Sequence, residues 1–224
     1  MEHLPVIKAA PLFQNIGEED LFGLLGCLHA KPRSFPKGAM ILRAGEPVTG
    51  FGMVLSGRVQ VTREDIYGTR TLLTQLDAGD LFAEAFAFAS APALPVSVEA
   101  AADCAVLFFD HTRLISPCAN GCAFHTQLIR NMMGILARKN LMLNSKIQHI
   151  SRRTTREKLL SYLNEQAHAR KSAQFIIPFD RQELADYLCV ERSAMSAELS
   201  RLQKEGVLSY HKSAFKLYAK GRED

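Results

Sequence analysis

Residues 191–197, Glu-Arg-Ser-Ala-Met-Ser-Ala, gather several hydrogen-bonding side chains in one short segment. The guanidinium of Arg192 can donate two parallel hydrogen bonds to O6 and N7 of guanine. Ser193 and Ser196 are three positions apart, so on a helix their hydroxyl groups share a face and can contact bases or phosphates. The segment therefore indicates recognition of base edges in double-stranded DNA.

Four polar residues flank this segment in the sequence. Arg181 and Gln182 directly follow Asp180, which can N-cap a helix, so they are placed to contact phosphate together with the amides of that helix end. His211 and Lys212 lie in a turn and can contact phosphate as well. The predicted DNA-binding set is Arg181, Gln182, Arg192, Ser193, Ser196, His211 and Lys212.

The elements that must position these residues follow the order helix, turn, helix, strand, strand. Apolar spacing predicts helices over 181–188 and 191–205, and Gly206 is typical of a residue that ends a helix. Two strands are expected over 207–210 and 215–218. This is the order of a winged helix-turn-helix, whose second helix enters the major groove with its N-terminal part near the bases.

The charge distribution favours a polyanionic partner for the same region. Residues 1–150 hold 13 Lys and Arg against 13 Asp and Glu, whereas residues 151–224 hold 14 against 10, so the whole net charge of +4 lies in the second part. A basic segment on a neutral body is typical of nucleic-acid binding.

The first half of the sequence changes in periodicity along its length. Residues 12–30 read as short helices, whereas 35–110 contain short apolar runs punctuated by glycines, which predicts a small barrel or roll. The expected strands are 40–42, 52–55, 58–62, 70–73 and 105–109, with a turn at Tyr67-Gly68. Further on, Thr154 to Glu157 can cap a helix that runs to about 169, and 175–179 is an expected edge strand because it contains Pro178.

A heptad pattern follows the roll. One apolar seam has spacings of four and three and comprises Ile129, Met133, Leu136, Asn140, Leu143, Ile147 and Ile150. A second row, Leu128, Met132, Ile135 and Met142, runs beside it. Two rows predict a helix that is buried on two sides, against the roll and against the same helix of a second chain, with Asn140 fixing the register. The alternative is that the whole helix packs inside a monomer.

Over essentially its whole length the sequence resembles the Crp/Fnr family of bacterial regulators. The segment from Phe179 to Ser196 is similar to the family's helix-turn-helix. Other segments are similar to its cyclic-nucleotide-binding-type roll: Lys37-Gly38, Ile41-Leu42, Gly45, Val54 to Gly57 and Gly79 to Glu84. The resemblance implies a homodimer, effector sensing in the roll, and recruitment or blocking of RNA polymerase.

The sequence departs from the cyclic-AMP-responsive members of that family at the nucleotide site. Those members hold ribose and phosphate with a Gly-Glu pair and a later Arg-Ser pair, where this chain has Ala83-Glu84 and Leu94-Pro95. Leu94 and Pro95 offer no charge, and proline has no N–H to donate. We therefore expect no binding of cyclic AMP. The expected effector pocket, for a small and weakly polar ligand or none, comprises Phe82, Glu84, Leu94, Leu143 and Asn144.

The recognition segment departs from the family as well. Ser193 stands where many members have Glu, and Ala197 stands where an Arg is common. The carboxylate that would recognise cytosine is absent where Ser193 replaces Glu. The operator should therefore differ from the usual half-sites while remaining an inverted repeat. Ala197 also leaves open an alternative, a small-molecule-binding module with weak or no DNA binding.

Iron–sulfur members of the family use a cluster of cysteines near the N-terminus, whereas this chain has only Cys27 before Cys104, so that cluster cannot form. The odd total of five cysteines argues against a disulfide framework. Most are expected to be reduced and buried. Cys118, Cys122 and His125 have a spacing that could serve a redox- or metal-responsive regulator. The other interpretation, small buried residues in a turn, is preferred because a structural zinc site usually has four ligands. No metal, haem or other cofactor is predicted.

Together these patterns predict an α+β chain with three parts: an effector roll over 1–123, a dimerisation helix over 124–150 and a winged helix-turn-helix over 151–224. No P-loop, G-x-S-x-G or H-E-x-x-H motif is present, so the chain is not expected to be an enzyme. No signal peptide or membrane-spanning segment is recognised, and a cytoplasmic location is expected.

Overall fold

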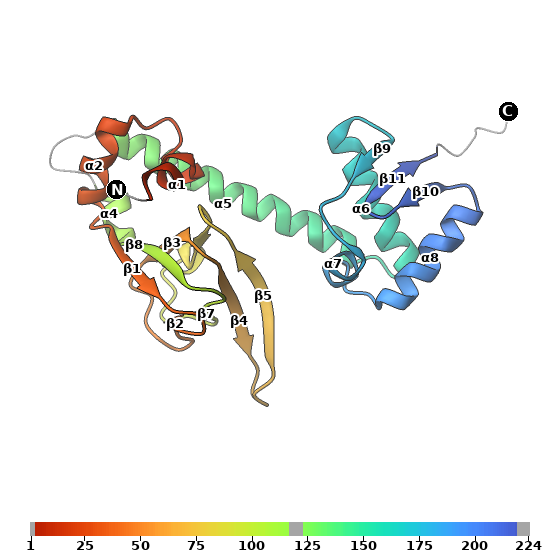
Figure 1. The fold of residues 1–224 in the computed structure, drawn as a ribbon, viewed down its shortest axis with the longest axis horizontal. Helices are drawn as coiled ribbons and strands as arrows, with labels where there is room; N and C mark the ends of the chain where they lie inside the picture. The colour runs from red at the N-terminus through yellow and green to blue at the C-terminus, as the bar shows by residue number, and fades with distance from the viewer. Residues whose placement is uncertain (1–2, 117–122, 219–224) are drawn as a thin grey trace. The chain divides into compact units, whose positions relative to one another are not determined.

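The computed structural model describes residues 3–116 and 123–218. The chain divides into two compact units, Met1–Ala137 and Arg138–Asp224, and the division falls within one long helix, α5 (Ala123–Ile150) (Figure 1). Among the described residues, no helix is both long and apolar enough to cross a membrane.

The first unit contains the predicted roll. Its two four-stranded antiparallel sheets have the strand orders β1-β8-β3-β6 and β2-β7-β4-β5. The strands are β1 (Lys31–Phe35), β2 (Met40–Leu42), β3 (Phe51–Ser56), β4 (Val59–Glu64), β5 (Arg70–Leu76), β6 (Leu81–Phe82), β7 (Ser97–Ala100) and β8 (Cys104–Phe109). All five expected strands are present, whereas β1, β6 and β7 were not expected from the sequence. The Tyr67-Gly68 turn is confirmed, and the Asp65 carboxylate accepts hydrogen bonds from the backbone of Tyr67 and Thr69, both at 2.9 Å.

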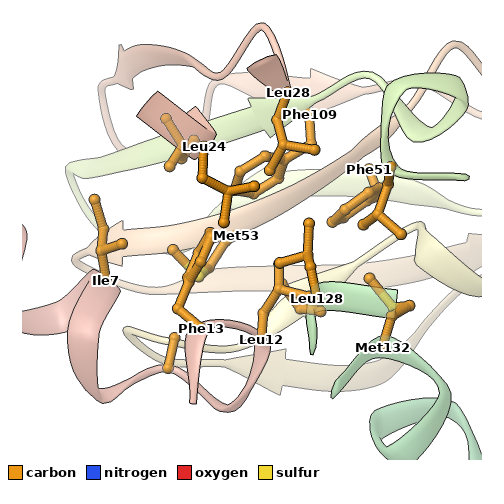
Figure 2. Close-up of a cluster of buried hydrophobic side chains, with 14 of the residues drawn as sticks. Ile7, Leu12, Phe13, Leu24, Leu28, Phe51, Met53, Phe109, Leu128 and Met132 are labelled. Atoms are coloured by element: carbon orange, nitrogen blue, oxygen red, sulfur yellow. The ribbon is translucent and has the colours of Figure 1, made fainter. Parts of the chain in front are cut away.

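Alternation along the strands of the roll creates two cores. On β8, Val106 belongs to the cluster between the two sheets, while Leu107 belongs to a second cluster on the outer face of the first sheet. Helices cover that outer face, and their apolar side chains meet Phe51, Met53 and Phe109 (Figure 2). These elements are α1 (Leu4–Ala9), the 3₁₀ turn η1 (Pro11–Phe13) and α2 (Glu18–Cys27), joined by the start of α5. Two short helices, α3 (Glu84–Phe88) and α4 (His111–Ile115), complete the unit.

Helix α5 confirms one predicted apolar row only in part. Leu128, Met132 and Ile135 are buried against the roll, as expected, but Met142 is 71% exposed. The core of the roll takes no residue of α5 beyond Leu136, so the row ends before Met142. In the other row, Ile129 and Leu136 are half-buried at the edge of that core, and Met133, Leu143 and Ile147 are exposed.

The second unit has three helices and a small sheet around its own core. The helices are α6 (Thr155–Arg170), α7 (Arg181–Tyr187) and α8 (Arg192–Lys204), and the strands β9 (Gln174–Ile176), β10 (Leu208–His211) and β11 (Ala214–Leu217) pair in the order β10-β11-β9. The edge position expected for β9 is confirmed. The strand ends at Ile176, earlier than expected, and Pro178, which has no N–H for a ladder, lies just outside it.

Candidate nucleic-acid interface

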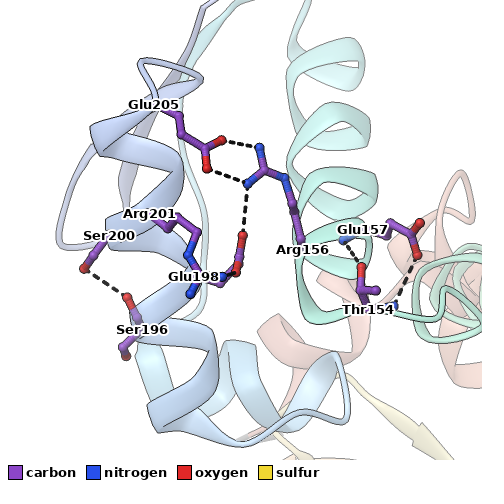
Figure 3. Close-up of polar contacts among 8 residues, drawn as sticks. All are labelled: Thr154, Arg156, Glu157, Ser196, Glu198, Ser200, Arg201 and Glu205. Atoms are coloured by element: carbon purple, nitrogen blue, oxygen red, sulfur yellow. Dashed lines mark hydrogen bonds and ion pairs between the residues drawn. The ribbon is translucent and has the colours of Figure 1, made fainter.

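Capping boxes fix where α6 and α7 begin. At α6, the Thr154 hydroxyl accepts a hydrogen bond from the Glu157 backbone at 3.1 Å, and the Glu157 carboxylate accepts one from the Thr154 backbone at 3.2 Å (Figure 3). Asp180 and Glu183 make the same reciprocal pair at α7, at 2.8 and 2.7 Å. Both caps satisfy amides that have no partner within the helix. The boundaries of these helices therefore follow from local sequence, as predicted.

A network of ion pairs attaches α8 to α6. The Arg156 guanidinium on α6 donates to the Glu198 carboxylate at 3.2 Å and makes a two-pronged contact with Glu205 (Figure 3). Arg201 donates to the second oxygen of Glu198 at 2.9 Å. The Glu198 side chain is only 11% exposed, so its charge needs these partners. The network holds α8 in one position against α6.

The turn between α7 and α8 depends on a residue with positive φ. Cys189 has φ +51°, a left-handed conformation that is unfavourable for a residue with a Cβ. The Lys158 ammonium donates to the carbonyl oxygens of Leu188 and Cys189 at 3.3 and 3.2 Å, which ties the turn to α6. Cys189 is exposed and Cys27 is half-buried, so of the described cysteines only Cys104 is buried as expected. Cys189 is exposed because the turn lies at the surface of the domain.

The two faces of α8 have different roles. Met195, Leu199 and Leu202 are fully buried in the core of the domain. Arg192 and Ser193 are exposed on the first turn, and Ser196 is half-buried one turn later. The N-cap residue, Glu191, forms no side-chain hydrogen bond with the backbone amides of the first turn. The start of α8 thus presents a guanidinium, a hydroxyl and N–H donors on one exposed surface, which suits an anionic partner.

Ser200 extends this surface and was not identified from the sequence. Its hydroxyl donates to the Ser196 carbonyl at 3.0 Å and lies 3.4 Å from the Tyr210 hydroxyl on β10. The spacing from Ser193 to Ser196 to Ser200 follows one helix face and could have revealed it.

Arg181 has a different environment from the one expected. It is half-buried, and its guanidinium donates to the Lys212 carbonyl at 2.8 Å. The same group lies over the rings of Tyr210 and Phe215, with distances of 4.7 and 5.2 Å to their centroids. Burial lowers the pKa of Arg181. These contacts attach the wing to the start of α7, so in the structure Arg181 positions the wing.

The remaining predicted residues are exposed. The Gln182 amide on α7 donates to Asp186 at 2.9 Å along the helix. His211 is the last residue of β10 and Lys212 lies in the turn that leads to β11; both are exposed, and Lys212 has φ +50°. The described geometry therefore brings all seven predicted DNA-binding residues into one domain, on α7, on α8 and on the wing.

Two sequence families match the chain, one in each of its two units. Residues 32–120 match the family described as the cyclic nucleotide-binding domain, and residues 157–217 match the Crp-like helix-turn-helix domain. The protein belongs to the Crp/Fnr family. As a member of this family it is a DNA-binding transcription regulator with an effector-binding domain. A comparison with curated proteins finds no match.

Solved structures of Crp/Fnr regulators share the fold. The catabolite activator protein of Thermus thermophilus is 22% identical, with 93% of this chain and 94% of that chain covered and a TM-score of 0.50. DNR from Pseudomonas aeruginosa is 21% identical, with coverage of 97% and 94% and a TM-score of 0.50. The c-di-GMP-responsive regulator CLP from Xanthomonas campestris is 19% identical, with coverage of 91% and 100% and a TM-score of 0.55.

The expected effector residues of this Crp/Fnr protein fall in both units. Phe82, Glu84 and Leu94 are buried in the roll, whereas Leu143 is 61% exposed and Asn144 is exposed on the part of α5 that belongs to the second unit. Ala83 has φ +62°, so the backbone keeps the glycine-like conformation although the residue is alanine.

The backbone at Leu94 is already engaged. Its N–H donates to the Glu46 carbonyl at 3.0 Å, and its carbonyl accepts from the Gly45 N–H at 2.9 Å. The adjacent Pro95 has no N–H. This short segment therefore offers neither a cation nor an uncommitted backbone donor to a cyclic phosphate.

Cys118 and Cys122 lie outside the described residues, so the predicted Cys-Cys-His group is represented only by His125. His125 is 7% exposed, and its Nε2 lies 2.9 Å from the Arg113 carbonyl oxygen. Over residues 3–116 and 123–218, no three His, Cys, Asp or Glu side chains are grouped as metal ligands would be.

Proposed function

We propose that the protein binds an inverted-repeat operator as a homodimer and regulates transcription under the control of an effector other than cyclic AMP. The observation that supports this most directly is the exposed first turn of α8, where Arg192 and Ser193 lie beside uncapped helix amides. In winged helix-turn-helix proteins this part of the second helix meets base edges in the major groove.

The wing and α7 supply the contacts that fix register in this proposal. His211 and Lys212 are exposed at the wing turn, and Gln182 is exposed on the first turn of α7. Side chains at such positions bind phosphate oxygens, which orient a protein on the duplex without distinguishing sequences. Arg181 supports them indirectly, because it holds the backbone of the wing turn through the Lys212 carbonyl.

The dimer is supported by the exposed apolar residues of α5. Met133, Leu143 and Ile147 are between 56% and 66% exposed, and all three are members of the heptad seam. Such a seam is typical of a helix that pairs with a copy of itself. A twofold dimer carries two copies of α8, which requires an operator with twofold symmetry.

The operator is tested by selecting bound sequences from random duplex DNA with purified protein. We expect enrichment of an inverted repeat whose half-sites lie about one helical turn, or a multiple of it, apart. Binding should weaken steeply with salt because phosphate contacts release counterions. No enriched repeat at any salt concentration would contradict the proposal.

Arg192→Gln tests the role assigned to α8. The variant should lose about 1–3 kcal/mol of discrimination for guanine at one position of each half-site, because a bidentate contact is removed. Lys204→Gln is the matched control, since it removes one positive charge from the opposite, exposed end of the same helix. Equal losses in the two variants would show that Arg192 contributes charge alone.

The effector proposal is tested by calorimetric titration with cyclic AMP. We expect no binding heat, because the Leu94 N–H already donates to Glu46 and Pro95 has no donor. Micromolar affinity for cyclic AMP would overturn this part of the proposal and leave the DNA-binding part intact.

A further inference from the structure

A pocket of about 300 Å³ opens at one end of the β-roll. We call it the edge pocket, because its walls include residues of β1 and β2, the strands at one edge of each sheet. Residues 47–50, which lead into β3, complete the wall. Leu94 is the only residue that it shares with the expected effector site, so the edge pocket is a separate place in the fold. Its volume lies at the small end of the range for ligand sites, about 300–1,000 Å³.

Strand register places two cations at this pocket. Lys31 pairs with Phe108 and Arg33 pairs with Val106 across the antiparallel β1–β8 ladder. Directly paired residues lie on the same face of a sheet. Val106 is fully buried between the two sheets, so Lys31 and Arg33 stand on the inner face of the roll, at its open edge. Both side chains line the edge pocket.

These cations are not neutralised by ion pairs. Neither Lys31 nor Arg33 forms a salt bridge with any described residue, and the Arg33 guanidinium lies 5.3 Å from the centroid of the Phe108 ring. The single carboxylate in the lining is Asp110. Its Oδ1 accepts hydrogen bonds from the Thr112 hydroxyl at 2.6 Å and from the Thr112 backbone at 2.9 Å. Both hydrogen bonds lower the pKa of Asp110, and the bond from the Thr112 hydroxyl has the largest effect. The carboxyl group therefore stays ionised at neutral pH.

The lining therefore carries one unbalanced positive charge when histidine is counted as neutral. Two cations and one carboxylate suit a ligand with a single negative charge better than a dianion. The apolar part of the lining includes Ile41, Leu42, Val48 and Phe108, and Phe108 lies directly beside Lys31 on β8. A ligand that suits both parts of the lining combines a carboxylate with a compact apolar body.

Backbone contacts hold the pocket in shape. The hydrogen bonds that join Gly45 and Glu46 to Leu94 fasten one end of the loop that leads into β3. At its other end, a Cβ on Gly50 would lie 2.2 Å from the Phe109 carbonyl oxygen, so the loop approaches β8 too closely for any other residue. The wall is therefore built before any ligand arrives, which lowers the entropic cost of binding.

We propose that the edge pocket binds a small monocarboxylate with an apolar body, its carboxylate held by Lys31 and Arg33 and its body against Leu42, Val48 and Phe108. The competing explanation is that Lys31 and Arg33 only protect β1, because inward-pointing charges prevent edge strands from pairing with other chains. The two explanations differ in whether the full chain binds a carboxylate. They also differ in whether removing the charges of Lys31 and Arg33 weakens that binding or causes self-association.

Full-length protein is titrated with benzoate and with isovalerate, and binding is followed by calorimetry and by ligand-observed NMR. Benzamide serves as the neutral analogue of benzoate, and inorganic phosphate serves as the anion without an apolar body. We expect one carboxylate per chain and no binding of benzamide. In the double variant Lys31→Gln, Arg33→Gln, affinity should fall at least about tenfold, since each charged hydrogen bond contributes more than a tenfold factor.

Lys37→Gln is the matched control, because Lys37 is exposed near the other end of β1 and does not line the edge pocket. Its affinity should equal that of the native chain. Circular dichroism tests whether each variant is folded. If the double variant is unfolded, the single variants Lys31→Gln and Arg33→Gln are titrated instead. The proposal is overturned if neither carboxylate binds, if phosphate binds more tightly than both, or if the variants lacking Lys31 or Arg33 keep full affinity. Self-association of the double variant without carboxylate binding by the native chain would establish edge protection instead.

Discussion

The two halves of α5 are both rich in apolar residues but have opposite surroundings. In the first half, one row of side chains is between 0% and 8% exposed and belongs to the core of the roll: Leu128, Met132 and Ile135. In the second half, four apolar side chains are between 56% and 71% exposed: Leu141, Met142, Leu143 and Ile147. Helical periodicity therefore identifies apolar faces without identifying what covers them, and the proposed dimer would cover part of this exposed apolar surface.

The sharpest test of this contrast removes a side chain from the buried half. Leu128→Ala should lower the free energy of unfolding by about 3 kcal/mol, because it leaves a cavity in a packed core. Leu141→Ala, 68% exposed in the other half, is the matched control and should change stability little. Urea denaturation measures both. A loss below about 1 kcal/mol for Leu128→Ala would mean that the start of α5 does not depend on the roll.

The exposed half is tested by the double variant Leu143→Ala, Ile147→Ala. If these residues form the dimer seam, the variant should lose about 2 kcal/mol of dimer stability, roughly a 30-fold rise in the dimer Kd. Sedimentation equilibrium measures the constant, and operator affinity should fall with it. A native chain that is monomeric at all concentrations would favour the alternative in which α5 serves a monomer.

Asn140 is the polar exception in the seam. Its side-chain oxygen accepts a hydrogen bond from Asn144 at 2.7 Å on the same helix. Asn140→Val should stabilise the assembly by about 1 kcal/mol and allow oligomers larger than a dimer, since a buried polar residue at such a position restricts strand number. Light scattering reports the masses. An unchanged, strictly dimeric variant would show that Asn140 does not control the oligomer.

The smallest effect is expected at Met142, which is exposed and stands outside the heptad seam. Met142→Gln should change both the free energy of unfolding and the dimer Kd by less than about 0.5 kcal/mol. Its thermal denaturation and sedimentation are compared with those of the seam variants. A clear loss would show that the contact surface on α5 is wider than the seam.

Local signals account for the accuracy of the winged-helix prediction. Asp180 and Glu183 cap α7, and Gly206 has φ +71° just after α8. Each of these signals lies within a few residues of the boundary that it fixes. Strand β1 could not be found in this way, because Lys-Pro-Arg-Ser-Phe is polar and contains proline. It is a strand because β8 lies beside it, which is a contact between distant parts of the chain.

The candidate site shows the same limit. Of the two serines that the sequence placed on one face of α8, Ser193 is exposed and Ser196 is half-buried. The sequence did not indicate that Arg181 holds the wing, because the Arg181 and Lys212 partners are 31 positions apart. A long-range hydrogen bond of one side chain to one carbonyl leaves no periodic pattern in the sequence.

The separation of the two faces of α8 has a consequence for how such a protein diverges. Met195, Leu199 and Leu202 carry the packing of α8, whereas Arg192, Ser193, Ala194 and Ala197 are exposed and contribute nothing to the core. Substitutions on the outer face can therefore accumulate without unfolding the domain. A duplicated gene could acquire a new set of target promoters by drift at a few surface codons, while purifying selection keeps the inner face unchanged.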